Sequence, residues 1–211
     1  MKILAVADEI SKPYYDHYKN GILEDIDLII SCGDLPKGYL EFLVTMAHCP
    51  LIYVHGNHDD RYSKEPPTGC TCIEDRIYEY KGIRFLGLGG SYRYRPDGIN
   101  MYTEKQMRRR ISRISRRIFL GKWRASGRNK PAFDVLVTHA AAGGLGDLDT
   151  PVHRGFSCFP ELMDRYHPGF MVHGHVHSNY GYRIPRDSDY HGTRIINACG
   201  HVIFEIPEGK H

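Results

Sequence analysis

Long hydrophobic runs are missing from this 211-residue sequence. No apolar stretch reaches the roughly 18 residues that a transmembrane helix needs, so no membrane span is expected. The apolar start, Met1 to Ala7, is too short for a signal peptide and is expected to be a core strand. Cys70 and Cys72 have no second cysteine pair to complete a zinc site, which favours incidental thiols. With six scattered cysteines and no export signal, we expect reduced thiols and a cytoplasmic location.

Positive charge is concentrated in one segment. Residues 101–130 contain 11 Lys and Arg and a single acid, so this segment carries +10 and the remainder of the +3 chain carries −7. Met107, Ile111, Ile114 and Ile118 have helical spacing, which predicts a basic helical insertion at about residues 101–130. Its helix is expected from about residue 103 to 125, docked by its apolar side. We favour a solvated charged face over the alternatives, which are nucleic acid, an acidic membrane surface or a partner subunit.

The pattern of apolar runs predicts a single α/β domain over residues 1–211. Runs typical of strands buried on both faces lie at residues 2–7, 26–31, 51–55, 83–88, 133–138 and 170–173. A helical pattern at residues 36–48 separates the second and third runs, which indicates βαβ units and a largely parallel layer. Shorter strand candidates at residues 180–184, 194–198 and 202–206 suggest a second, mostly antiparallel layer.

Side chains that can bind metals directly follow several of these predicted strands. Ligand sites in open α/β sheets lie at the carboxyl ends of the strands, so residues far apart in the sequence are expected to meet there. The candidates are Asp8, Asp34, Asn57, His139, His175 and His177. Carboxylate, imidazole and amide groups together suit Mn²⁺, Fe or Zn²⁺ better than Ca²⁺. Two such ions can activate a water molecule and clamp phosphate oxygens.

Each motif alone has an ordinary structural explanation. Gly33-Asp34 is typical of a turn, His139 could be a hydrogen-bonded core histidine, and His175 and His177 could line one face of a strand end. Their occurrence together and in this order favours a metal site.

In these motifs the sequence resembles the calcineurin-like metallophosphoesterase superfamily over essentially its whole length. Four of the family's elements match: Gly-Asp at 33–34, Gly-Asn-His-Asp at 56–59, a strand-end histidine at 139, and Gly-His-Val-His at 174–177. The resemblance implies a four-layer αββα sandwich, with two mixed β-sheets face to face and helices outside. It also implies a metal-dependent phosphoesterase with two divalent ions. We expect Mn²⁺, with Fe, Zn²⁺ or Ni²⁺ as alternatives.

The resemblance further implies roles for individual residues. One ion would take Asp8, Asp34 and His177, and the other would share Asp34 and take Asn57, His139 and His175. His58 would contact the phosphate and protonate the leaving oxygen, which suits a side chain that can be cationic near neutral pH. Asp34 and Asp59 are the candidates for holding His58 in place.

The first motif departs from the family pattern. The family has Asp-x-His, whereas Asp8-Glu9-Ile10 ends in a side chain that cannot bind metal. We therefore expect weaker binding of the Asp8/His177 ion, with a single-metal site as an alternative. Glu9 is adjacent, but strand alternation predicts that it points away from Asp8 unless the chain has already left the strand.

Substrate contacts are expected from the segment after the His139 strand. His153 and Arg154 lie in a loop similar to one found in small metallophosphoesterases grouped with cyclic-nucleotide phosphodiesterases, and arginine is well suited to hold phosphate. Alternatively they cap a helix predicted at residues 158–167. We predict a phosphodiesterase in preference to a monoesterase. The alternatives are a nuclease, a nucleotide or protein phosphatase, and a non-catalytic scaffold on the same fold.

Overall fold

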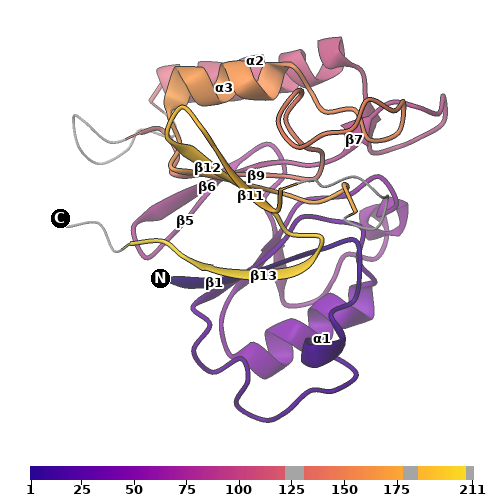
Figure 1. The fold of residues 1–211 in the computed structure, drawn as a ribbon, viewed down its shortest axis with the longest axis vertical. Helices are drawn as coiled ribbons and strands as arrows, with labels where there is room; N and C mark the ends of the chain where they lie inside the picture. The colour runs from indigo at the N-terminus through magenta and orange to yellow at the C-terminus, as the bar shows by residue number, and fades with distance from the viewer. Residues whose placement is uncertain (122–130, 178–184, 208–211) are drawn as a thin grey trace.

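The computed structural model describes residues 1–121, 131–177 and 185–207. Two sheets form the centre of the molecule, with helices on their outer sides (Figure 1). The first sheet has the order β13-β1-β2-β3-β4, and the second has the order β11-β12-β10-β9-β6-β5. Among the described residues, no helix is both long and apolar enough to cross a membrane.

The first sheet is parallel except at one edge, where β13 runs antiparallel to β1. In the second sheet β12, β10, β9 and β6 are parallel, and the edge strands β11 and β5 are antiparallel. The strands of the first sheet are β1 (Lys2–Ala7), β2 (Leu28–Ser31), β3 (Leu51–Tyr53), β4 (Cys70–Cys72) and β13 (Gly200–Glu205). Those of the second are β5 (Ile77–Tyr80), β6 (Ile83–Leu88), β9 (Val135–Thr138), β10 (Phe170–His173), β11 (Asp187–Tyr190) and β12 (Thr193–Asn197).

In the described part of the chain, three α-helices cover the sheets. Helix α1 (Lys37–Ala47) lies on the outer side of the first sheet, and α2 (Glu104–Phe119) and α3 (Cys158–Tyr166) lie over the second (Figure 1). The short elements are η1 (Lys12–Tyr14), η2 (Asp60–Ser63), β7 (Ser91–Tyr92) and β8 (Met101–Tyr102). This arrangement confirms the predicted αββα layering. The expectation of a second, mostly antiparallel layer is wrong, because β12, β10, β9 and β6 are parallel and β13 joins the first sheet beside β1.

Alternation along β1 explains why its sequence is apolar throughout. Ile3 and Ala5 pack between the two sheets, whereas Leu4 and Val6 pack against the α1 side, and all four are fully buried. Successive side chains of a strand point to opposite faces, so a strand enclosed on both faces has no polar positions. The rigid ends of such strands are the positions where the candidate ligands are attached.

The predicted basic helix begins where the sequence indicated but ends earlier. Thr103 forms a capping box with Gln106, which fixes the start of α2. The helix ends at Phe119, and not near residue 125 as predicted, because Gly121 adopts φ +76° and its N–H bonds to the Ile118 carbonyl. The strand predicted at 180–184 lies outside the described residues.

One arginine of α2 is buried, contrary to the prediction that the arginines face solvent. Arg110 is only 6% exposed. Its Nη1 donates to the Gly89 carbonyl and its Nε donates to Asp75, both at 2.8 Å, and its Nη2 pairs with the Glu74 carboxylate. Arg108 pairs with Glu161 of α3. These two arginines of the basic segment therefore neutralise acids of the same molecule.

The Glu74–Arg110 pair predicts loss of stability in acid. Burial opposes the charge of Glu74, but the hydrogen bond with His55 and the Arg110 guanidinium outweigh burial and lower the pKa of Glu74 to about 2. A carboxylate with a depressed folded pKa stabilises the fold above its unfolded value of 4.5, and this contribution disappears as the pH falls towards 2. We expect a loss of about 3 kcal/mol over this interval, measured by urea unfolding, and a smaller loss in Glu74→Gln. Equal losses in both proteins would contradict the assignment.

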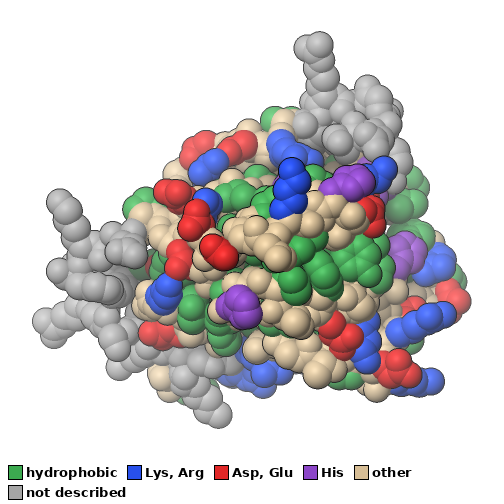
Figure 2. Space-filling model, turned by 90° about the horizontal axis from the view of Figure 1, so that it is seen from below, with side chains coloured by type: hydrophobic (Ala, Val, Ile, Leu, Met, Phe, Trp, Pro, Cys, Tyr) green, Lys and Arg blue, Asp and Glu red, His purple; other side chains and the backbone are tan. Residues whose placement is uncertain are grey.

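Charge on the opposite side of the molecule is mixed. Figure 2 looks onto the α1 side, and among the described residues acidic and basic side chains are interspersed there with apolar ones. The asymmetry seen in the sequence therefore does not appear on this face as a field of one sign.

Candidate metal centre

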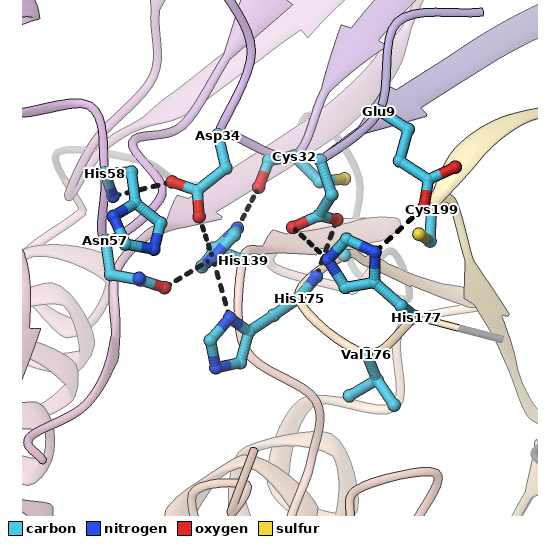
Figure 3. A network of polar contacts seen from close by, with 12 residues as sticks. Glu9, Cys32, Asp34, Asn57, His58, His139, His175, Val176, His177 and Cys199 are labelled. Atoms are coloured by element: carbon cyan, nitrogen blue, oxygen red, sulfur yellow. Dashed lines mark hydrogen bonds and ion pairs between the residues drawn. The ribbon is translucent and has the colours of Figure 1, made fainter. Parts of the chain in front are cut away.

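The predicted ligands gather at the carboxyl ends of strands from both sheets. Asp8 follows β1, Asp34 lies three residues after β2, and Asn57 follows β3 in the first sheet. His139 directly follows β9, and His175 lies two residues after β10, in the second sheet. The two sheets therefore contribute opposite sides of one site, as Figure 3 shows for the side chains it labels.

Four ligand atoms converge on a small volume. One atom each from Asp8, Asp34, His139 and His175 lies within 4.8 Å of the others. The Nε2 atom of His139 is 3.1 Å from His175 Nδ1 and 3.4 Å from Asp34 Oδ2. It is also 2.9 Å from the amide oxygen of Asn57 (Figure 3). The structure thus brings together the donors Asp34, Asn57, His139 and His175, which were predicted for one ion, and places Asp8, which was predicted for the other ion, beside them.

Backbone carbonyls select the ring nitrogen that each histidine presents. His139 Nδ1 is 2.8 Å from the Cys32 carbonyl, and His175 Nε2 is 2.7 Å from the Val152 carbonyl. A carbonyl can only accept, so these two nitrogens carry hydrogen and donate. The opposite nitrogens face one another and can offer lone pairs inward, which is how histidine ligands are commonly oriented. This arrangement fits a bound cation.

The charges at the cluster have the same implication. Burial disfavours the cationic form of His139, but the neighbouring Asp34 carboxylate outweighs it and raises the pKa of His139 to about 9. Burial also opposes the charge of Asp34, but His139 outweighs it and lowers the pKa of Asp34 to about 2. Burial, with the neighbouring His139, lowers the pKa of His175 to about 3. A positive charge is therefore stabilised at this point, and a metal ion can replace the proton of His139.

Three of the clustered residues have a left-handed backbone. Asp8, Asp34 and His175 have φ values of 62°, 58° and 67°. This region is uncommon for residues other than glycine and is found where the surrounding structure holds a functional side chain in place. Here backbone N–H groups hold the carboxylates: His175 donates to Asp8 Oδ2 at 2.8 Å, and His58 donates to Asp34 Oδ1 at 2.7 Å.

Asp59 supports the site through the backbone. The N–H groups of Gly56 and Asp34 both donate to Asp59 Oδ2, at 2.7 and 2.8 Å. Burial raises the pKa of Asp59 to about 6. Asp59 thus ties together the two loops that carry Asp34 and Asn57. A role of Asp34 or Asp59 in holding the His58 ring stays a prediction.

The glycine of the Gly-Asn-His-Asp motif leaves room for Asp34. A Cβ at Gly56 would lie 2.0 Å from Asp34 Oδ1, closer than any non-bonded contact allows. We expect Gly56→Ala to displace this carboxylate and weaken metal binding by about 10- to 100-fold, measured by calorimetric titration. Gly38→Ala is the matched control, because a Cβ at that position meets nothing within 4 Å. Equal affinities in the two variants would contradict this role.

An open cleft adjoins the cluster. Its volume is about 560 Å³, and Asp34, His58 and Asp59 form part of its lining together with Lys37 and Arg61. His58 lies beside Asp34 and Asn57 in Figure 3. Two cationic side chains therefore share a cleft with the predicted proton donor.

The two predicted substrate contacts lie in different places. The His153 ring is 5.4 Å from the His175 ring and its Nδ1 is 3.0 Å from Thr150 Oγ1, so His153 borders the metal cluster. Arg154 lies over the Tyr92 ring at 5.2 Å and lines a separate cleft of about 270 Å³. Neither residue lines the cleft that contains His58.

Comparison with known proteins identifies the family. The sequence profile described as calcineurin-like phosphoesterase matches residues 1–179. The chain belongs to this family. In this calcineurin-like phosphoesterase the Asp/His cluster is a candidate metal-binding site, and the family is one of phosphoester hydrolases.

This calcineurin-like phosphoesterase is similar in sequence to two uncharacterized proteins and in fold to a solved structure. An uncharacterized protein of Haemophilus influenzae is 26% identical over 193 residues, which cover 80% of this chain and 81% of the relative. The uncharacterized protein MJ1162 of Methanocaldococcus jannaschii is 23% identical over 225 residues, which cover 100% of this chain and 89% of the relative. The crystal structure of TT1561 of Thermus thermophilus aligns with a TM-score of 0.60 at 13% identity, covering 94% of this chain and 88% of that one.

One acidic residue of this phosphoesterase lies where the predicted exception to strand alternation places it. Glu9 was expected to point away from Asp8 unless the chain had already left the strand, and β1 does end at Ala7, with Asp8 turning the chain at φ +62°. Glu9 Oε1 consequently lies 2.9 Å from His177 Nδ1. The only signal in the sequence was the absence of a histidine at position 10, which left a ligand position to be filled.

Proposed function

We propose that this protein is a metal-dependent phosphodiesterase. The observation that carries the proposal is the convergence of Asp34, Asn57, His139 and His175. Backbone carbonyls select which ring nitrogen each of the two histidines directs inward. His58 lies beside this cluster in an open cleft. An open cleft admits a substrate that is substituted on both sides of the phosphorus, which favours diesters over monoesters.

The four clustered residues would hold one divalent ion, and the mixed oxygen and nitrogen donors favour Mn²⁺, with Fe, Zn²⁺ or Ni²⁺ as alternatives. A second ion would lie on the side of Asp8 and His177, the pair that the family resemblance assigns to it. When bound, such ions supply an activated water molecule and neutralise charge on phosphate oxygens.

The remaining chemistry falls to side chains of the cleft. His58 would donate a proton to the oxygen that leaves, because an imidazole can carry this proton near neutral pH and release it during the reaction. Lys37 and Arg61 line the same cleft and would bind further anionic groups of the substrate. His153 borders the cluster and would contact the substrate from the opposite sheet. Arg154 would act only on a substrate long enough to reach its separate cleft.

A paired assay tests the proposal. Metal-stripped protein is restored with Mn²⁺, and hydrolysis of bis-p-nitrophenyl phosphate is compared with that of p-nitrophenyl phosphate. We expect turnover of the diester to exceed turnover of the monoester. Faster monoester turnover would indicate a phosphatase, and cleavage of single-stranded RNA or DNA in a parallel assay would identify a nuclease. Absence of turnover with metal bound would move the scaffold alternative to first place.

A further inference from the structure

A second group of metal-binding side chains lies beside the Asp/His cluster. One donor atom each from Glu9, His177 and Cys199 lies within 4.8 Å of the other two. Figure 3 shows Glu9 and Cys199 together on one side of His177. The three come from segments that follow β1, follow β10 and precede β13. The fold therefore brings these three residues together although they are far apart in the sequence.

The backbone fixes two of the three residues in this position. The left-handed turn at Asp8 directs Glu9 towards β10. Cys199 forms a β-bridge with Ala7, at the end of β1, and its carbonyl accepts a hydrogen bond of 2.8 Å from Arg186. Cys199 is only 4% exposed, which protects a thiol ligand from solvent.

The two ring nitrogens of His177 face different partners. Nδ1 is 2.9 Å from Glu9 Oε1, whereas Nε2 is 3.9 Å from Asp8 Oδ1. Only the Glu9 contact is a hydrogen bond, because 3.9 Å is too long for one. An ion bound at this point would take the place of the hydrogen between His177 Nδ1 and Glu9 Oε1.

We propose that Glu9, His177 Nδ1 and Cys199 Sγ bind the second divalent ion, and that its chemical class is that of Zn²⁺ or Co²⁺. A thiolate, an imidazole and a carboxylate are ordinary zinc ligands, and catalytic zinc sites use three protein ligands with a fourth position open. Tetrahedral zinc would require donor atoms about 3.4 Å apart. The present donor distances are 2.9 Å between Glu9 and His177 and at most 4.8 Å within the group, and Glu9 is half exposed, so its side chain can move to adjust them.

This assignment explains how the chain can bind a second ion with isoleucine at position 10. Glu9 and Cys199 would join His177 in place of the missing histidine and of Asp8, which the family resemblance assigns to this ion. Asp8 belongs instead to the neighbouring cluster. The neighbouring cluster offers no sulfur among its donors, so the two positions would prefer different ions. The proposal rests on the proposed metal-dependent function for the presence of a second ion, but a binding measurement decides it even if no phosphoester is hydrolysed.

Cobalt binding to the reduced, metal-stripped protein provides the test. Cobalt held by a thiolate gives a charge-transfer band in the near ultraviolet, which cobalt held only by oxygen and nitrogen does not. We expect this band in the wild type and a loss of the band with about one equivalent of bound cobalt in Cys199→Ser. Glu9→Gln should weaken cobalt binding in the same step. Cys70→Ser, at a more exposed thiol, should keep the band.

His139→Ala separates the two positions, because it should remove the neighbouring ion and leave the thiolate band. Circular dichroism establishes that each variant is folded, and the exposed Glu9 allows a conclusion even if Cys199→Ser is unstable. A band that persists in Cys199→Ser, or cobalt that binds fully in the wild type without a band, would overturn the proposal. Loss of diesterase activity alone would leave it standing.

Discussion

Replacement of His58 by alanine is expected to slow diester hydrolysis by about 10²- to 10⁴-fold while the protein keeps its bound metal. The imidazole lies in the cleft beside Asp34, where it can protonate the leaving oxygen, and no clustered ligand atom comes from its ring. The measurements are kcat with bis-p-nitrophenyl phosphate and metal content after dialysis. For a substrate with a more acidic leaving group the fold decrease in kcat should be smaller, because its leaving oxygen depends less on protonation.

The control is His17→Ala, which removes another exposed histidine after η1 and should leave kcat unchanged. Added imidazole should restore part of the activity of His58→Ala, because it can enter an open cleft. If His58→Ala turned over the diester as fast as the wild type, His58 would not be the proton donor. If the variant lost its metal, the lower kcat would result from impaired metal binding and not from the loss of a proton donor.

Replacement of Arg110 by alanine is expected to lower the free energy of unfolding by about 3–5 kcal/mol. The change removes the hydrogen bonds to Gly89 and Asp75 and leaves the buried Glu74 carboxylate without its guanidinium partner. Breaking a buried pair from one side costs more than the pair contributes, because the remaining charge has no water around it. Equilibrium unfolding in urea gives the value directly.

Arg113→Ala on the same helix is the matched control. Its side chain is exposed, and the change should alter stability by less than about 0.5 kcal/mol. Replacing Arg110 by methionine and Glu74 by leucine together should recover much of the loss, since two apolar groups leave no charge without a partner. A full-sized loss in Arg113→Ala would show that helix propensity, and not the buried pair, determines the effect.

The parts of this molecule that sequence reasoning predicted are those governed by burial and by strand ends. The apolar runs at residues 2–7, 83–88 and 170–173 became β1, β6 and β10 with unchanged bounds. Asp34, His139 and His175 met because the carboxyl ends of strands in both sheets lie at one edge. Periodicity and strand direction are local properties, so the sequence alone carries them.

The parts that were not predicted depend on backbone geometry or on partners distant in the sequence. The turn at Asp8 decides between the two directions that the sequence left open for Glu9, and no local pattern distinguishes an aspartate at φ +62° from one in a strand. Arg110 belongs to a strongly basic segment, and its burial depends on Glu74 and Asp75, about 35 residues earlier. In the sequence nothing distinguishes Cys199 from the other five cysteines, and only the bridge to Ala7 shows that it lies beside the end of β1.

The pairing of β1 with β13 also constrains the order in which the protein can fold. In the first sheet β1 pairs with β13. Beside this pair, the Met1 amino group donates to the Ile206 carbonyl, a contact between residues 205 positions apart. Contacts of such long range form late and slow folding. During synthesis, β1 must therefore wait with an unprotected edge until β13 has emerged from the ribosome. Pairing with β13 covers this edge of β1 and removes it as a site for aggregation of the nascent chain, and β13 becomes the edge strand of the sheet.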